Sequence, residues 1–327
     1  MTLRLPHNWL WDFWHAWSGA DCHLFYVQAP RSLGSEELRH HHATIGHAVS
    51  RDLKSWTVVT DALHPGTDGE WDDLATWTGS VIGHDGRWFM LYTGVNRSEG
   101  GLVQRIGLAS STDLYTWEKD PANPILEADP RWYELLDLNS WYEQAWRDPW
   151  LFLHEGDGLF HALFTARDRS GPPDGRGVIG HASSSNLRDW TVRPPLVTPG
   201  GFGHLEVPQL VAANGRYFLL FSCAAQHTAG TQGERLEQPP RTGTYCLVAD
   251  QTFGPYDFVD GRMLVGDAIG SYYGGKLIDD SSSRLQFMAF KLRDRNGVFV
   301  GELIDPVPVV IEDITGPRLE ISLAKRN

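Results

Sequence analysis

The sequence predicts an all-β protein, a five-bladed β-propeller of four-stranded sheets, because one strand pattern repeats along the whole chain. Aromatic-rich segments recur at intervals of roughly 60–70 residues, which is typical of repeat architectures. Turn dipeptides precede three of them and predict hairpins: Asp85-Gly86, Asp157-Gly158 and Asn214-Gly215. The five segments are His23–Tyr26, Trp88–Tyr92, Phe160–Phe164, Tyr217–Phe221 and Leu285–Phe290.

A second motif, Ser-x-Asp/Asn-Leu-x-x-Trp, follows three of these segments and predicts a turn and then an outer strand. Its Asp52, Asp113 and Asn186 are expected to form turns only. A fourth copy at 249–256 is degraded, and a fifth is not recognisable. We expect a single domain over residues 1–327, with one short helix within 129–144 and a tail after Asp313 that helps to close the ring. Two packed β-sandwiches are the alternative, but they do not explain the even period.

Composition narrows the function. The chain has 327 residues, with 28 Lys and Arg against 41 Asp and Glu, so its net charge is −13. This balance disfavours nucleic acid and anionic membranes as partners and suits a small neutral substrate. The 14 tryptophans fit either an aromatic core or sugar binding. The composition does not predict an oligomeric state.

Cysteine use and the amino-terminal residues bear on the cellular compartment. Cys22, Cys223 and Cys246 have no disulfide or zinc spacing and are expected to be buried thiols. The first residues contain no apolar signal-peptide region, and no apolar run approaches the length of a membrane span. We therefore expect a cytoplasmic protein that does not enter a membrane.

Three acids occupy equivalent places ahead of the aromatic strands of the first, third and fourth units: Asp12, Asp148 and Glu206. In a propeller the residues that lead the innermost strands converge at one mouth of the central channel. Trp77–Ser80 and Ser271–Tyr273 hold the same place in the second and fifth units. Paired carboxylates at one point are the chemistry of glycoside cleavage. The simpler alternative is that each acid only caps a turn or marks a strand edge.

Two other groups of polar residues have structural explanations. His40-His41-His42 resembles a metal-binding tract but falls in a charged loop between strands, so no metal site is expected there. Asp72 and Asp73 are expected either to rim the pocket or to form a turn.

At this point the motifs resemble glycoside hydrolase family 32, which contains invertases, levanases and inulinases. Two departures lie beside the first acid. Trp11 replaces the family's usual asparagine, and the form Trp11-Asp12-Phe13-Trp14 is closer to the related family 68 of levansucrases. Val207 stands where cysteine is usual. No family 32 type C-terminal β-sandwich is expected. The matching segments, in order, are Trp9–Asp12 with His23–Tyr26 and Pro30, Trp71–Asp73, Trp77–Ser80, Tyr92–Gly94, Arg147–Pro149, Glu206–Leu210 and Ser271–Tyr273.

The resemblance implies a retaining mechanism at one pocket. Asp12 would be the nucleophile and Glu206 the general acid and base, protonated at rest. Asp148 would bind sugar hydroxyls, and Arg147 would keep Asp148 charged. Trp77 and Trp14 are expected stacking surfaces. Further expected sugar contacts are Gln28, Ser80 and Tyr273.

No metal or organic cofactor is expected for this reaction, although a structural calcium would be compatible with the family 68 resemblance. The bulky residues around Asp12 predict an exo-acting pocket for short substrates. The main interpretation is a β-fructofuranosidase that acts on sucrose or small fructans. Three alternatives remain open: a levansucrase-like fructosyltransferase, an inverting pentosidase of the family 43 type, and a non-catalytic sugar-binding propeller.

Overall fold

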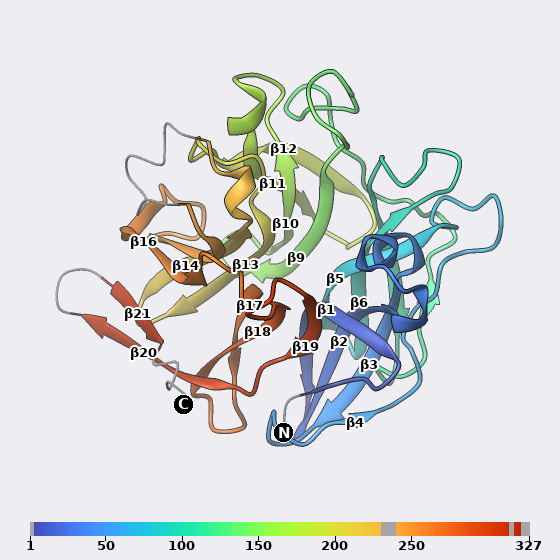
Figure 1. Ribbon diagram of the computed structural model, residues 1–327, viewed down its shortest axis with the longest axis horizontal. Coiled ribbons are helices and arrows are strands. Elements are labelled where there is room, and N and C mark those ends of the chain that lie inside the picture. The colour runs from blue at the N-terminus through green and yellow to red at the C-terminus, as the bar shows by residue number, and fades with distance from the viewer. Residues whose placement is uncertain (1–2, 230–239, 314–316, 322–327) are drawn as a thin grey trace.

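Five antiparallel sheets surround a central axis in the computed structural model, which describes residues 3–229, 240–313 and 317–321. Figure 1 shows the first strand of each sheet next to the axis and the later strands further out. The predicted all-β five-bladed propeller is therefore confirmed. Four short 3-10 helices lie in connections: η1 (Arg31–Leu33), η2 (Glu36–His42), η3 (Pro173–Gly175) and η4 (Ala225–His227).

The first four blades each contain four strands in sequence order. Blade one has β1 (Asn8–Ser18), β2 (Asp21–Pro30), β3 (Thr44–Ser50) and β4 (Thr57–Val58). Blade two has β5 (Ala75–His84), β6 (Arg87–Val95), β7 (Arg105–Ser111) and β8 (Glu118–Lys119). Blade three has β9 (Trp146–His154), β10 (Leu159–Arg167), β11 (Gly177–Ser184) and β12 (Trp190–Val197). Blade four has β13 (Glu206–Ala213), β14 (Arg216–Cys223), β15 (Thr242–Ala249) and β16 (Asp257–Asp267).

Blade five differs because its second strand pairs with two later strands. It contains β17 (Tyr272–Asp279), β18 (Leu285–Arg293), β19 (Phe299–Leu303), β20 (Val307–Asp313) and β21 (Pro317–Ile321). The ring closes through β19, where Leu303 N donates to Leu3 O and Arg31 donates to Val300 O and Gly301 O. The predicted closure by the tail after Asp313 is therefore wrong for the described residues, in which β20 and β21 form the outer edge of this blade. Residues 314–316 and 322–327 lie outside the described part.

The repeated aromatic positions mark the core. Each of them lies on the second strand of its blade and is almost fully buried: Tyr26, Tyr92, Phe164, Phe221 and Phe290. The Ser-x-Asp/Asn motif forms the predicted turn. Asp52 Oδ1 accepts hydrogen bonds from the N–H groups of Lys54 and Ser55, and the equivalent side chains of Asp113 and Asn186 do the same in their own turns.

Two sequence expectations concern regions outside the repeat. Residues 129–144 form turns and isolated bridges, so the helix predicted there is wrong. Two acids open these turns, since Asp129 O and Asp137 O accept hydrogen bonds from Trp132 N and Ser140 N. Among the described residues, none forms a β-sandwich beyond the fifth blade. That residues 1–327 form a single domain stays a prediction.

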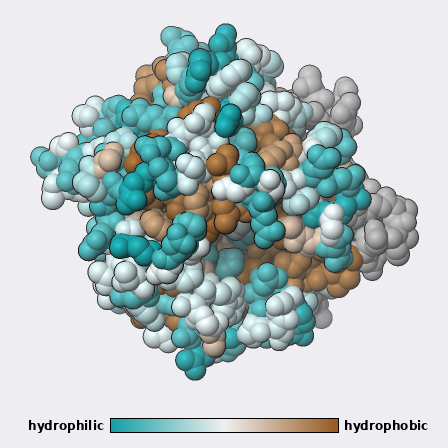
Figure 2. Space-filling view, turned by 180° about the vertical axis from the view of Figure 1, so that it is seen from behind, coloured by the Kyte–Doolittle hydropathy of each residue, from teal (hydrophilic) through white to brown (hydrophobic). Residues whose placement is uncertain are grey.

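The surface opposite to that of Figure 1 is hydrophilic at its rim, with apolar residues toward its middle (Figure 2). No helix in the described parts of the chain is long and apolar enough to cross a membrane.

Candidate active site

The first strand of every blade carries a β-bulge at the same level, and these bulges build the site. The register shifts lie at Trp11/Phe13 in β1, at Trp77/Gly79 in β5, opposite Leu163/Thr165 in β9, at Glu206/Gln209 in β13 and at Tyr273/Lys276 in β17. A bulge bends its strand and re-aims a side chain. Asp12, Asp148 and Val207 adopt positive φ angles of 24°, 56° and 53° there. Such conformations are strained for residues other than glycine and are found at functional sites.

The bulged ends of the first strands open into one cavity of about 700 Å³, a size typical of small-molecule sites. Asp12, Asp148 and Glu206 all line it, as their common place in the repeat predicts. Trp77, Arg147 and Tyr273 line the same cavity. Of the nine residues expected at the site, the structure therefore brings six together.

Asp12 is held by neighbouring blades. Thr78 Oγ1 donates a 2.9 Å hydrogen bond to Asp12 Oδ2, and a Cβ atom on Gly274 would approach Asp12 Oδ1 to 3.1 Å. Gly274 also has a positive φ of 60°, so glycine suits both the backbone and the close approach to the carboxylate. Burial and the charge of Asp148 raise the pKa of Asp12 to about 7, even though the bond from Thr78 acts to lower it.

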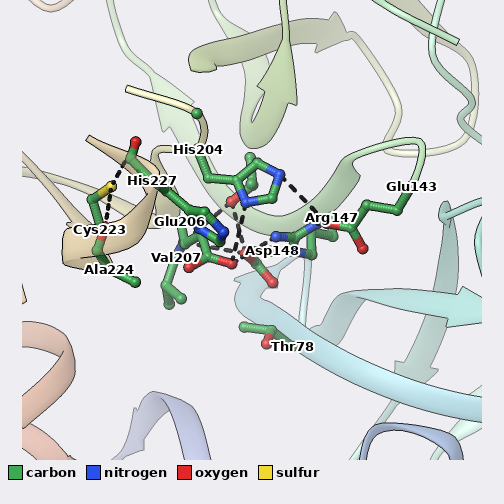
Figure 3. Close-up of polar contacts among 12 residues, drawn as sticks. Thr78, Glu143, Arg147, Asp148, His204, Glu206, Val207, Cys223, Ala224 and His227 are labelled. Atoms are coloured by element: carbon green, nitrogen blue, oxygen red, sulfur yellow. Dashed lines mark hydrogen bonds and ion pairs between the residues drawn. The ribbon is translucent and has the colours of Figure 1, made fainter. Parts of the chain in front are cut away.

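Arg147 joins the other carboxylates (Figure 3). Its Nη2 donates to Glu206 Oε1 at 2.6 Å, its Nη1 donates to Glu143 Oε1 at 2.8 Å, and its Nε lies 3.5 Å from Asp148 Oδ2. Asp148 Oδ2 also accepts hydrogen bonds from Thr165 Oγ1 at 2.7 Å and from Val207 N at 3.2 Å.

Glu206 differs from its sequence-based expectation. The phenol of Tyr273 donates a short hydrogen bond to Glu206 Oε2. Burial would raise the pKa of Glu206, but the charge of Arg147 and the bond from Tyr273 outweigh burial and lower that pKa. Burial raises the pKa of Asp148 despite Arg147. The pKa of Glu206 is thus lowered while those of Asp12 and Asp148 are raised, which is opposite to the direction that a protonated Glu206 at rest requires.

A buried lysine adjoins the acids and was not found from the sequence. Lys276 on β17 is 4% exposed, and its Nζ donates to Val207 O at 3.1 Å and Pro208 O at 2.9 Å. Burial lowers its pKa to about 7, against the charges of Asp148 and Asp12. The lysine thus secures the bulge beside Glu206. The sequence signal for it is a cation four residues after the start of the inner strand β17.

Comparison with known proteins identifies the family. Residues 15–290 match the glycosyl hydrolases family 32 N-terminal domain. The chain belongs to glycosyl hydrolase family 32. It is therefore a glycoside hydrolase whose substrate is a carbohydrate.

Three similar proteins show how much of the chain the resemblance covers. An extracellular sucrase of Zymomonas mobilis is 24% identical in an alignment of 348 positions, gaps included, which covers 91% of this chain and 78% of the relative. A levansucrase of the same organism is 27% identical over 304 residues, covering 79% of this chain and 68% of the relative. An inulosucrase from Halalkalicoccus jeotgali bound to kestose has the same fold, with a TM-score of 0.78, 24% identity, and coverage of 97% of this chain and 88% of the inulosucrase.

The relatives correct the expected location. The sucrase relative is extracellular, so the expectation of a cytoplasmic protein is wrong. That expectation depended on the lack of an apolar run among the first residues. The three cysteines of the chain are free and buried, as expected.

The remaining three expected sugar contacts lie outside the family 32 cavity. Trp14 is 1% exposed and packs against Phe25 in the core. Gln28 is hydrogen-bonded to Asn8 and Asp61 at the end of β2. Ser80 is buried and accepts a hydrogen bond from Leu151 N in the next blade. Trp14 and Ser80 follow the bulges of β1 and β5, where the alternation of side chains between the two faces of a strand is interrupted. Gln28 lies on β2, the second strand of its blade.

The histidine tract and the Asp72–Asp73 pair differ in their relation to the cavity, which His40 lines and the two aspartates do not. His40 lines the cavity, and its carbonyl accepts a hydrogen bond from Trp77 Nε1 at 2.7 Å, so this part of the histidine tract forms a wall of the pocket. Asp72 binds Tyr92 and Lys119, and Asp73 accepts hydrogen bonds from Gly69 N and Arg97 N, so both are structural.

Within the described parts of the chain, one group could hold a metal ion, away from the three acids of the cavity. His154, Asp157 and His161 place their ligand atoms within 4.8 Å of one another at the β9–β10 turn. Asp148 lies near the other end of β9, six residues from His154, which corresponds to roughly 20 Å along a strand. A metal at this turn would not touch the acids.

Proposed function

We propose that this protein is a retaining β-fructofuranosidase that releases terminal β-fructofuranosyl units from sucrose or small fructans. The observation that carries the proposal is the meeting of Asp12, Asp148 and Glu206 in one cavity of a family 32 propeller. A sugar-binding module needs no such cluster, because three closely spaced acids that repel one another cost folding free energy.

Each acid has a separate task in this proposal. Asp12 attacks the anomeric carbon and forms a fructosyl ester. Glu206 donates a proton to the leaving oxygen and then takes one from water, while Asp148 accepts hydrogen bonds from sugar hydroxyls. A retaining enzyme of this type places the nucleophile and the acid about 5–5.5 Å apart.

Substrate binding has to move the proton from the aspartates to Glu206. Sugar hydroxyls that donate to Asp12 and Asp148 stabilise these groups as carboxylates and lower their pKa. The same sugar excludes water from Glu206, which raises its pKa. Substrate therefore produces the arrangement that catalysis needs, with a charged nucleophile and a protonated acid.

The shape of the cavity favours exo action. Side chains from all five blades or their connections surround it, including Trp11, Trp77, Tyr142 and Tyr273, so the pocket closes around one end of a substrate. A single terminal fructosyl unit fits this shape better than the middle of a polymer does.

Fructosyl transfer is the second candidate function. Trp11-Asp12-Phe13-Trp14 has the form of the levansucrase motif, and a levansucrase is among the relatives. Hydrolysis and transfer share the fructosyl ester and differ only in whether water or a sugar attacks it.

Product analysis with sucrose, raffinose, inulin and levan tests both candidates. Hydrolysis of sucrose releases fructose and glucose in equal amounts, whereas transfer leaves glucose in excess and lengthens an oligosaccharide. NMR of the first-formed fructose, recorded before mutarotation, should show the β-furanose. Early α-furanose would indicate inversion and remove the nucleophile role from Asp12, and no released sugar from any substrate would contradict the proposed function.

A further inference from the structure

A buried histidine lies directly behind Glu206. His204 precedes β13 by two residues, and its side chain is completely buried. Its Nε2 accepts a 3.0 Å hydrogen bond from Trp141 Nε1. An indole N–H can only donate, so Nε2 must carry a lone pair, and a neutral His204 must carry its proton on Nδ1.

The ring stays neutral for two reasons. Burial, followed by the charges of Arg147, His227 and Arg167, holds the pKa of His204 well below its usual value. A protonated ring would also set its Nε2–H against the indole N–H of Trp141. Two carboxylates face the ring, Glu143 and Glu206, and both are already paired with Arg147.

The Nδ1–H of His204 has no hydrogen-bond partner among the described residues. Glu206 Oε1 lies 3.9 Å away from it. Figure 3 shows the ring next to Glu206, with Glu143 on its other side. An orphaned buried donor costs free energy, and a shift of less than about 1 Å would bring the two atoms to hydrogen-bond distance. Active-site bonds that are long in a free enzyme often tighten when substrate binds.

We propose that His204 is a positioning residue for Glu206, held by Trp141 in the Nδ1–H tautomer so that it donates to Glu206 Oε1 as the leaving oxygen takes the proton of Glu206. This role rests on the proposed function, in which Glu206 is the general acid. The donor stabilises the carboxylate that forms in the transition state, and it holds Oε1 so that Oε2 stays directed at the substrate.

Trp141 is needed because the opposite tautomer has a competing partner. Glu143 Oε1 lies 3.4 Å from His204 Nε2 and would accept a proton placed there. The indole occupies that nitrogen instead. Trp141 is itself fixed by the guanidinium of Arg167, which lies 3.7 Å from the ring centroid. Arg167 in turn is bound to Glu134 and to the carbonyls of Gly203 and Pro173.

Variants at His204 separate a donor at Nδ1 from a merely structural ring. His204→Asn keeps an amide N–H near the place of Nδ1, whereas His204→Gln places its amide near Nε2, and His204→Leu keeps neither. With sucrose, the Gln and Leu variants should lose about ten- to hundred-fold in kcat/KM, and Asn should recover most of that loss.

Leaving-group dependence is the decisive measurement. β-Fructofuranosyl fluoride needs little proton donation, so kcat/KM with this substrate should change only slightly in the Gln and Leu variants. Equal losses with sucrose and the fluoride would overturn the positioning role, because a distorted pocket slows both. So would full sucrose activity in the Gln variant.

The tautomer can be measured without any activity. In ¹⁵N NMR of the histidine-labelled protein, the resonances absent from His204→Asn belong to His204. We expect a neutral Nδ1–H ring from pH 5 to 8, and a shift toward Nε2–H in Trp141→Phe. An Nε2–H or cationic ring in the wild-type protein would overturn the assignment. If the wild-type protein releases no fructose, the proposed function fails, and this measurement still decides the state of His204.

Discussion

Arg147 is the cation that lies among Glu143, Glu206 and Asp148, so its removal is a sharp test of the site. Its guanidinium donates to Glu143, Glu206 and Gln104 and approaches Asp148, and its side chain is 9% exposed. Arg147→Met keeps an unbranched apolar side chain in place of the aliphatic part of arginine and removes the positive charge. Breaking a buried ion pair from one side costs about 3–5 kcal/mol, because the remaining charges are left uncompensated. We expect that loss in the free energy of unfolding at pH 7.5.

The loss should depend on pH in a defined direction. The pKa of Glu206 in the folded protein is lowered from its usual value of 4.5, so its charged form stabilises the fold above that pH, and this contribution disappears as the pH falls. The variant lacks that contribution at every pH. The difference between wild type and variant should therefore be largest at neutral pH and shrink below about pH 4.5, where the carboxylates take up protons.

Urea unfolding followed by tryptophan fluorescence at pH 7.5 and pH 4 measures this difference. Arg188→Met is the matched control, because Arg188 pairs with Asp120 at 2.9 Å but its side chain is 57% exposed. The control should lose less than about 1 kcal/mol at either pH. If Arg147→Met loses the same free energy at both pH values, or no more than the control, then Arg147 does not hold the carboxylates in their charged state.

Three further outcomes follow from the same site. Asp12→Asn and Glu206→Gln should each lower turnover by several orders of magnitude in fructose-release assays, and a normal rate in either variant would remove the substituted residue from the mechanism. Asp12→Asn should also unfold at a higher urea concentration than wild type at pH 8, because the raised pKa of Asp12 marks a charge that opposes folding as the pH rises. The pH profile of kcat/KM should fall above about pH 7, where the cluster loses the proton that Asp12 holds in the free enzyme, and a flat profile to pH 9 would contradict the shared proton. Dialysis against EDTA should leave kcat unchanged, since the histidine and aspartate group at the β9–β10 turn is remote from the acids; a loss restored by a divalent ion would refute this.

The fold was predictable because its signals are local and repeated. Phe164 and Phe221 lie on the second strands of hairpins, and the turn dipeptide of each hairpin comes a few residues before them in the sequence. The regular spacing of these segments therefore locates the core. The failed helix within 129–144 shows the limit of this approach. That connection contains apolar residues such as Leu135 and Leu138, but it forms turns because Asp129 and Asp137 open them, and tertiary bridges fix the rest.

The site was only partly predictable because the bulges are not visible in the sequence. Asp12, Asp148 and Glu206 were found from their place in the repeat. Trp14 and Ser80 were expected at the sugar from the resemblance alone, and both lie just after a bulge, which interrupts the alternation of side chains along the strand. The contacts of Lys276 and His204 are made by atoms of other blades or distant loops, at Val207 O and Trp141 Nε1, so no spacing rule reveals them.

Polar contacts near the axis connect the catalytic acids to the ring itself. Thr78 of blade two binds Asp12 of blade one, Asp148 N of blade three binds Thr93 of blade two, and Val207 N of blade four binds Asp148. Blade five continues the series, since Gln209 of blade four exchanges two hydrogen bonds of 2.7 Å with Leu277. Each strained bulge is therefore held by the blade beside it, which is the condition under which such strain persists. The relative positions of the three carboxylates are set by how the blades pack, and substitutions that loosen a blade contact at this level should alter catalysis even where they touch no sugar.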